Sequence, residues 1–271
     1  MKEKKPILPV KYDVVFRMFF ADERNIESLT SFLKSVLHLA EEDYEEIEIA
    51  DPHLLRDYND DKLAIIDVKL HTKSKKTIHI EIQLKVTAGL VNRIIYYGSK
   101  LITEQIGDKG KYANINKVIS IIITDESLFK DSPKYHHRFY ICEPETGVVL
   151  SDLVEYHTLE LEKLPDNEDG TKLYDWAKFI AAETEEELDM LAERNPEVGR
   201  AVVKLRELSA DEKARDLYER RLKSERDKAM FVDNALYEVA QRLLDMGDSI
   251  ERVIAATGLT KREIEFYQQQ A

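Results

Sequence analysis

Residues 63–85 read Leu-Ala-Ile-Ile-Asp-Val-Lys-Leu-His-Thr-Lys-Ser-Lys-Lys-Thr-Ile-His-Ile-Glu-Ile-Gln-Leu-Lys. Branched apolar residues alternate with polar ones on both sides of residues 73–76, which predicts two β-strands joined by a tight turn. Side chains alternate between the two faces of a strand. One face of the second strand is therefore expected to carry His79, Glu81, Gln83 and Lys85.

Two carboxylates in this hairpin are candidate metal ligands. Pairing the strands can bring Asp67 beside Glu81, and Asp67 interrupts an almost continuous apolar stretch, where an unpaired carboxylate is costly. Magnesium prefers oxygen ligands, uses one or two carboxylates and keeps several waters, and the carbonyl of Ile82 is a further ligand candidate. A bound cation of this kind activates water against a phosphodiester. The alternative interpretation is the solvated face of a half-buried sheet.

Two side chains beyond Glu81 are candidates for a supporting role. Gln83 is expected on the same face, where it can orient an attacking water or stabilise developing charge. Because its amide is neutral, Gln83 can act neither as a base nor as a cation. Lys85, four residues beyond Glu81, is our candidate for the missing positive charge.

The rest of residues 1–170 alternates helical and strand patterns. Residues 12–38 predict an amphipathic helix interrupted near residues 22–25, and residues 88–106 predict a second helix that ends at residues 107–110. Tyr96 and Tyr97 in that helix are adjacent and cannot both face the core. The remaining expected strands lie near residues 47–49, at 118–124 as a central strand covered on both faces, at 139–142 and 148–150 around a turn, and at 157–161.

From residue 171 onward the pattern is helical, with Trp176 expected in the core. We divide the chain into residues 1–170, a helical segment at 171–232, and a small unit at 233–271. That unit predicts helices at 235–246, at 249–256, and from Thr260 to about residue 268. A short helix, a Gly-containing turn and a following helix match the helix-turn-helix plan, and either DNA binding or protein packing is consistent with the unit.

Composition sets limits on the class of protein. The 271 residues carry a net charge of -13. Residues 155–199 hold 14 acidic against 4 basic residues, so acidity is concentrated there and basic surfaces elsewhere remain compatible with a nucleic-acid partner. A single cysteine excludes an internal disulfide and a cysteine-based zinc site. We find neither a signal-peptide pattern at residues 1–5 nor an apolar run of about 18 residues, so we expect a cytoplasmic protein without a membrane partner.

The order of these motifs resembles a known superfamily. An Asp, a hairpin and then Glu-x-Gln is similar to the PD-(D/E)XK nucleases, in the variant that has Gln where most members have Lys. Within that superfamily, the chain resembles the Rpn family of recombination-promoting nucleases and transposases over roughly residues 10–230. The segments that carry this resemblance are Tyr-Asp-Val-Val-Phe-Arg-Met-Phe at 12–19, Ile-Asp-Val at 66–68, Ile-Glu-Ile-Gln at 80–83, Arg93 through Tyr97, the stretch at 157–164, and Trp-Ala-Lys-Phe at 176–179.

The resemblance implies an α/β restriction-endonuclease-like core, in which helices flank a mixed central sheet, and a helical C-terminal extension. It also implies a DNA endonuclease that acts in recombination or transposition. Asp67 and Glu81 would hold Mg²⁺, or Mn²⁺ in its place, and Gln83 would take the third active-site position. Asp13 matches an accessory ligand or water-orienting position, and a helix N-cap is the alternative.

Two further expectations follow from the resemblance. Because double-strand cleavage needs two active sites or two encounters, we expect a homodimer. The alternative function is a degenerate nuclease fold that serves as a DNA-binding or protein-interaction module, in which Gln83 reflects lost activity.

Overall fold

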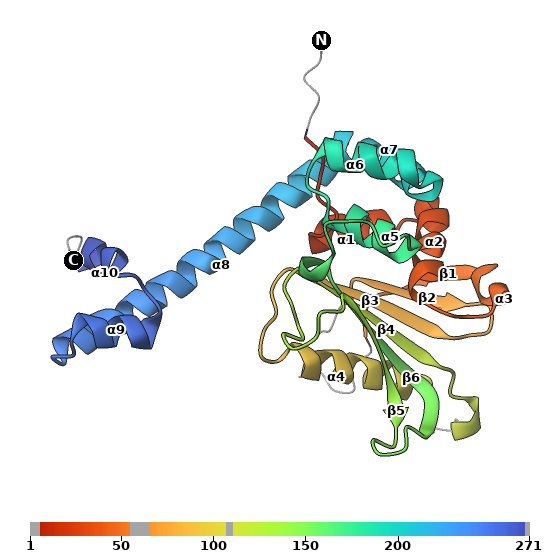
Figure 1. The fold of residues 1–271 in the computed structure, drawn as a ribbon, viewed down its shortest axis with the longest axis horizontal. Coiled ribbons are helices and arrows are strands. Elements are labelled where there is room, and N and C mark those ends of the chain that lie inside the picture. Colours follow the sequence, from red (N-terminus) through yellow and green to blue (C-terminus); the bar gives the residue numbers. More distant parts are fainter. Residues whose placement is uncertain (1–5, 55–65, 107–110, 269–271) are drawn as a thin grey trace, which may run out of the picture. The chain divides into compact units, whose positions relative to one another are not determined.

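A computed structural model describes residues 6–54, 66–106 and 111–268 (Figure 1). The predicted strand start at residues 63–65 and the predicted helix end at residues 107–110 lie outside these ranges. The chain divides into two compact units, Met1–Arg215 and Asp216–Ala271, with the division inside one long helix.

A six-stranded mixed sheet forms the centre of the first unit, in the order β1-β2-β3-β4-β6-β5. Neighbouring strands are antiparallel at β1/β2, β2/β3 and β5/β6, and parallel at β3/β4 and β4/β6. All seven residues of β4 are buried, which confirms the predicted central strand. The strands are β1 (Ile47–Ala50), β2 (Val68–Thr72), β3 (Thr77–Gln83), β4 (Val118–Thr124), β5 (His136–Cys142) and β6 (Val149–Glu160).

One long strand was wrongly predicted as two separate strands. The segments at 148–150 and 157–161 were expected as separate strands, but both belong to β6, except Val148, which precedes it, and Leu161, which begins a 3-10 turn. The register of β5 on β6 shifts between Tyr140 and Cys142, where such irregularities bend a strand without ending it. The polar residues in the middle of β6 interrupt the apolar strand pattern in the sequence, although the strand itself continues.

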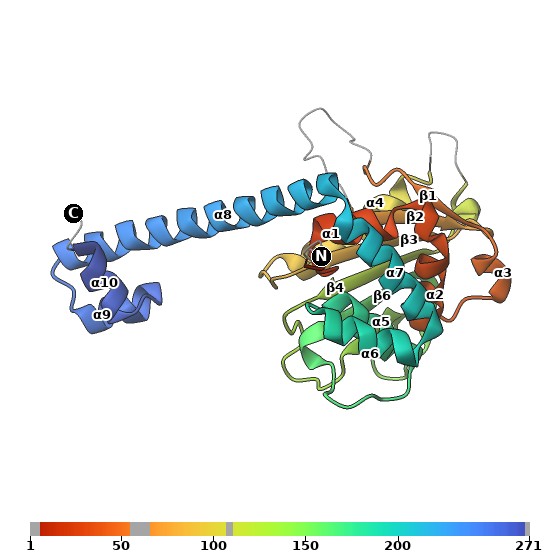
Figure 2. The same ribbon diagram turned by 90° about the horizontal axis from the view of Figure 1, so that it is seen from above.

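Helices cover both faces of the sheet. Figure 1 shows α4 on one side and α1, α2 and α5 on the other, and Figure 2 shows the second layer from above. The predicted interruption at residues 22–25 is confirmed, because the carboxylate of Asp22 accepts the N–H of Arg24 and starts a separate 3-10 turn, η1 (Glu23–Asn25). The helices of this unit are α1 (Asp13–Phe20), α2 (Ile26–Val36), α3 (Glu41–Tyr44), α4 (Leu90–Thr103), α5 (Lys172–Ala181), α6 (Glu185–Arg194) and α7 (Pro196–Ala210), with further 3-10 turns η2 (Tyr112–Asn114) and η3 (Leu161–Lys163).

An aromatic cluster joins α1, α2 and α5 above the sheet. Trp176 is fully buried, as predicted, and its ring lies 6.1 Å from that of Phe32 and 5.5 Å from that of Phe179. Phe20 contacts Phe16 and Phe32 in the same cluster. Offset and edge-on aromatic pairs add to the stabilisation from burial, so this cluster fixes α1 relative to α2 and α5.

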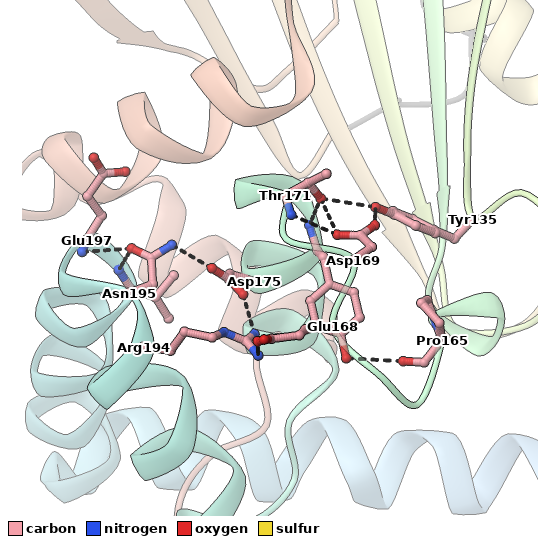
Figure 3. A network of polar contacts seen from close by, with 11 residues as sticks. Tyr135, Pro165, Glu168, Asp169, Thr171, Asp175, Arg194, Asn195 and Glu197 are labelled. Carbon is pink, nitrogen blue, oxygen red and sulfur yellow. Dashed lines mark hydrogen bonds and ion pairs between the residues drawn. The ribbon is translucent and has the colours of Figure 1, made fainter.

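A polar network holds α5, α6 and α7 together (Figure 3). Arg194 bonds both Glu168 and Asp175, and the side-chain amide of Asn195 donates to Asp175 over 2.9 Å. The same Asn195 caps α7, and Thr171 caps α5. Helices that the sequence pattern assigns to the segment 171–232 thus pack in the same unit as the sheet as far as Arg215.

The second unit is a small helical bundle built on the end of α8 (Glu212–Asp245), with α9 (Ile250–Thr257) and α10 (Lys261–Gln268). The helix predicted at 235–246 is the last part of α8, which starts 23 residues earlier as one continuous 34-residue helix. The capping predictions are confirmed: Gly258 ends α9 with φ +74°, and the Thr260 hydroxyl accepts the N–H of Glu263. Its buried core is Ala240, Val253, Leu259 and Ile264.

Candidate active site

The hairpin places the two predicted carboxylates side by side. Val68 pairs with Ile80, so Asp67, one residue before β2, lies level with Glu81 on β3. The Oδ2 atom of Asp67 accepts the backbone N–H of Ile82 over 2.9 Å. Gln83 follows on the same strand, and its amide donates to Glu81 Oε2 over 3.3 Å. Three of the predicted site residues therefore converge.

Both carboxylates are buried, which excludes the alternative of a solvated sheet face. Asp67 is 8% exposed and Glu81 5% exposed. Burial raises the pKa of Asp67 to about 6, against the opposing effects of the Ile82 N–H and the Arg17 charge. Burial, reinforced by the charge of Asp67, raises the pKa of Glu81 to about 8. Two adjacent buried acids cannot both ionise cheaply unless a cation compensates them.

Helix α1 adds two charged residues to this pair. Asp13 is the first residue of α1 and follows the N-cap position, which Tyr12 occupies, so the N-cap alternative for Asp13 does not hold. Its carboxylate accepts the N–H of Val14, and its charge contributes to raising the pKa of Asp67. Arg17, one turn later on the helix, places Nε 3.8 Å from Asp67 Oδ1. The site therefore includes the start of α1.

Sequence reasoning gave Arg17 no role, although it stands in the quoted motif. The signal was its spacing: Asp13 and Arg17 are four residues apart and so share one face of a helix. Once Asp13 is considered as a site residue, Arg17 on the same face is a candidate as well.

Helix α4 approaches the carboxylates from another direction. The charge of Arg93 lowers the pKa of both Asp67 and Glu81, opposing the effect of burial. Tyr97, one turn further along, packs against a buried apolar cluster, and burial together with the Glu81 charge raises its pKa. Its neighbour Tyr96 is 49% exposed, so the prediction that the two tyrosines face differently is confirmed.

Lys85 lies outside the strand that was expected to position it. β3 ends at Gln83, and Lys85 is exposed in the bend that follows. The alternation that assigned Lys85 to the face of Glu81 does not reach this residue. Its role as the compensating cation stays a prediction.

The donor set fits a hard cation that keeps most of its water. Within residues 6–54, 66–106 and 111–268, no group of three or more His, Cys, Asp or Glu side chains is arranged to hold a metal. Magnesium, however, is commonly bound by only one or two carboxylates. In these ranges Glu81 Oε1 is buried without a hydrogen-bond partner, which leaves a carboxyl oxygen for such a cation.

Comparison with known proteins agrees with this geometry. A family model described as PD-(D/E)XK nuclease family transposase matches residues 10–235. The chain belongs to this family. The match spans Asp13, the hairpin of β2 and β3, and α4 of this PD-(D/E)XK protein, and its mixed sheet flanked by helices is consistent with the PD-(D/E)XK fold. Both the resemblance and the fold class read from the sequence are confirmed.

The family is one of nucleases, which generally use divalent metals and act on DNA. No curated protein and no solved structure matches the chain. Among the helices of the described residues, none has the length and apolar character needed to cross a membrane.

Proposed function

We propose that this PD-(D/E)XK protein is a metal-dependent DNA endonuclease that acts in recombination or transposition, with Asp67 and Glu81 holding Mg²⁺ or Mn²⁺. The observation that carries the proposal is the buried carboxylate pair, in which Glu81 Oε1 has no partner in the described residues. Burying two acids side by side without compensation costs folding free energy. A bound cation would offset that cost, and membership of a nuclease family supports a catalytic task for it.

Each residue of the site has a distinct task in this proposal. Ile82 N–H fixes Asp67 through Oδ2, and Gln83 fixes Glu81 through Oε2, so Asp67 Oδ1 and Glu81 Oε1 are the oxygens that would hold the cation. Gln83 orients water but carries no charge. When bound, the cation would polarise a phosphate oxygen and lower the pKa of water. Asp13 adds negative charge that acts on Asp67.

Plasmid cleavage with Mg²⁺ or Mn²⁺ tests the function directly. Asp67→Asn and Glu81→Gln each remove one anionic ligand while keeping the side-chain shape, and each should reduce cleavage at least a hundredfold. Glu48→Gln, an exposed acid on the neighbouring strand β1, is the matched control and should cleave like the wild type. Equal cleavage by all four proteins, or none by any of them, contradicts the proposal.

A catalytically degenerate DNA-binding or interaction module is the second candidate, and Gln83 is the observation that favours it. The neutral amide stands next to the paired acids at a position where most of the superfamily carries Lys. Metal-dependent DNA binding without cleavage would identify this case. In the C-terminal unit, Lys261 and Arg262 open α10, but acidic residues follow at once, so DNA binding by α9 and α10 stays a proposal beside protein packing. A homodimer and a cytoplasmic location likewise remain proposals, which sedimentation and fractionation can test.

A further inference from the structure

Arg17 is the one cationic side chain of the described residues that is seen to contact the carboxylate pair. Its Nε lies 3.8 Å from Asp67 Oδ1, while 41% of its side chain is exposed to solvent. The Asp67 side chain is only 11% exposed. The guanidinium therefore stands at the mouth of the buried site, with one end directed at the acid and the rest reaching solvent.

The hydrogen bonding of Asp67 decides which oxygen a cation can take. Oδ2 already accepts the Ile82 N–H at 2.9 Å, whereas Oδ1 faces Arg17 at a distance longer than a hydrogen bond. Oδ1 is thus the oxygen left for a divalent cation, which sits about 2.1 Å from its ligands. A cation there would lie within a few ångströms of the guanidinium, and their like charges would repel.

We propose that Arg17 pairs with Asp67 only while the site holds no metal, and that a divalent cation displaces it outward to bind a DNA phosphate. This inference rests on the proposed function and extends it. Arg17 then supplies the positive charge that Gln83 lacks, from α1 instead of from the strand. A guanidinium suits this role because its planar fork of donors matches phosphate oxygens.

Packing makes Arg17 better placed than the other candidates. α1 is fixed by buried Phe16 and Phe20 on either side of Arg17 in the sequence, so the base of its side chain has a defined position beside the site. Lys85 lies in the bend after β3 and is exposed. Arg93 on α4 influences both acids through its charge, but among the described residues no ion pair joins it to either carboxylate.

The test measures metal and DNA binding separately, in Arg17→Gln and in Arg17→Lys. Titration of Mn²⁺ into the DNA-free protein should show several-fold tighter binding in Arg17→Gln, because the competing charge has gone. Binding of a short DNA duplex, with Ca²⁺ in the site, should weaken by about tenfold. The plot of log DNA affinity against log salt concentration should become less steep, its slope falling in magnitude by about 1, as expected when one phosphate contact is lost. Arg17→Lys should restore most of the salt slope.

In Arg17→Gln the Mn²⁺ affinity should rise while the DNA affinity falls. A structural defect would instead weaken both, so the opposite changes distinguish this mechanism from misfolding. Arg24→Gln, which removes an exposed arginine from η1, is the control and should change neither affinity. Unchanged or weaker Mn²⁺ binding, or unchanged DNA affinity, in Arg17→Gln would overturn the inference. A wild-type protein that binds Mn²⁺ and DNA without cleaving would instead contradict the proposed function, and the two affinities would still decide the role of Arg17.

Discussion

Replacing Glu81 by Gln should stabilise the metal-free protein, and increasingly so as the pH rises. The folded state raises the pKa of Glu81 from 4.5 to about 8, chiefly by burial. Between these two values the folded protein binds a proton that the unfolded chain has released. Wild-type stability therefore falls as the pH rises through this window, and Glu81→Gln, which is neutral at every pH, does not share that loss.

The size of the effect follows from the same shift. At pH 7 the unfolded carboxyl is almost fully ionised and the folded one almost fully protonated, so the difference amounts to about 3 kcal/mol at 1.36 kcal/mol per pKa unit. Part of the pKa shift is shared with Asp67, so we expect Glu81→Gln to be more stable than the wild type by on the order of 2–3 kcal/mol at pH 7. Near pH 5 the two proteins should differ little.

Urea unfolding in EDTA at pH 5, 7 and 8.5 measures this difference, with Glu48→Gln as the exposed control. Saturating Mg²⁺ should then make the wild type more stable than Glu81→Gln, because the cation binds only the folded wild-type site and stabilises it by mass action. A stability difference that stays constant across pH would refute the raised pKa. Equal stabilisation of both proteins by Mg²⁺ would refute Glu81 as a ligand.

Three further substitutions test the packing and the charge pairing of the fold. Gly98→Ala should destabilise the fold by about 1–3 kcal/mol, because the new Cβ would lie 2.9 Å from the hydroxyl of Tyr156, so that either the Tyr156 ring or α4 must shift. Tyr156→Phe in the same chain should recover part of the loss in chemical unfolding. Trp176→Ala should cost about 3–5 kcal/mol by the same measurement, since it empties the centre of the aromatic cluster, and a loss below 1 kcal/mol would contradict that placement. Burial alone would raise the pKa of Glu155, but hydrogen bonds from His157, Arg138 and Lys117 outweigh it and hold the pKa well below its usual range. Glu155→Gln should therefore cost about 3 kcal/mol at pH 7. This cost should shrink as the pH falls below 4.5, because the unfolded carboxyl then takes up a proton that the folded one does not.

Local periodicity accounts for the parts of the site that the sequence predicted. Alternation on both sides of residues 73–76 predicted β2 and β3, and their antiparallel pairing places Asp67 level with Glu81. The same alternation failed for Lys85, because the end of a strand depends on its neighbours: β3 loses its pattern where the chain leaves β4 after Gln83.

Contacts distant in sequence account for what could not be predicted. Arg17 and Asp67 are fifty residues apart, and their meeting requires α1 to pack beside β3, while Phe19 and Phe20 hold the helix against α5. The segment after residue 171 looks separate because it is acidic and helical. Its apolar residues, with Trp176 among them, are needed to cover α2, so it packs in the same unit as the core.

By itself the sequence determined the hairpin, the two metal-binding candidates and the family, because short-range alternation and the order of motifs are properties of the chain alone. Tertiary structure decided the state of those candidates. It buried Asp67 and Glu81, left Glu81 Oε1 without a partner in the described residues, and set Arg17 at the remaining oxygen of Asp67. Burial, pKa and charge pairing depend on every element packed around a group, and no single stretch of sequence contains that information.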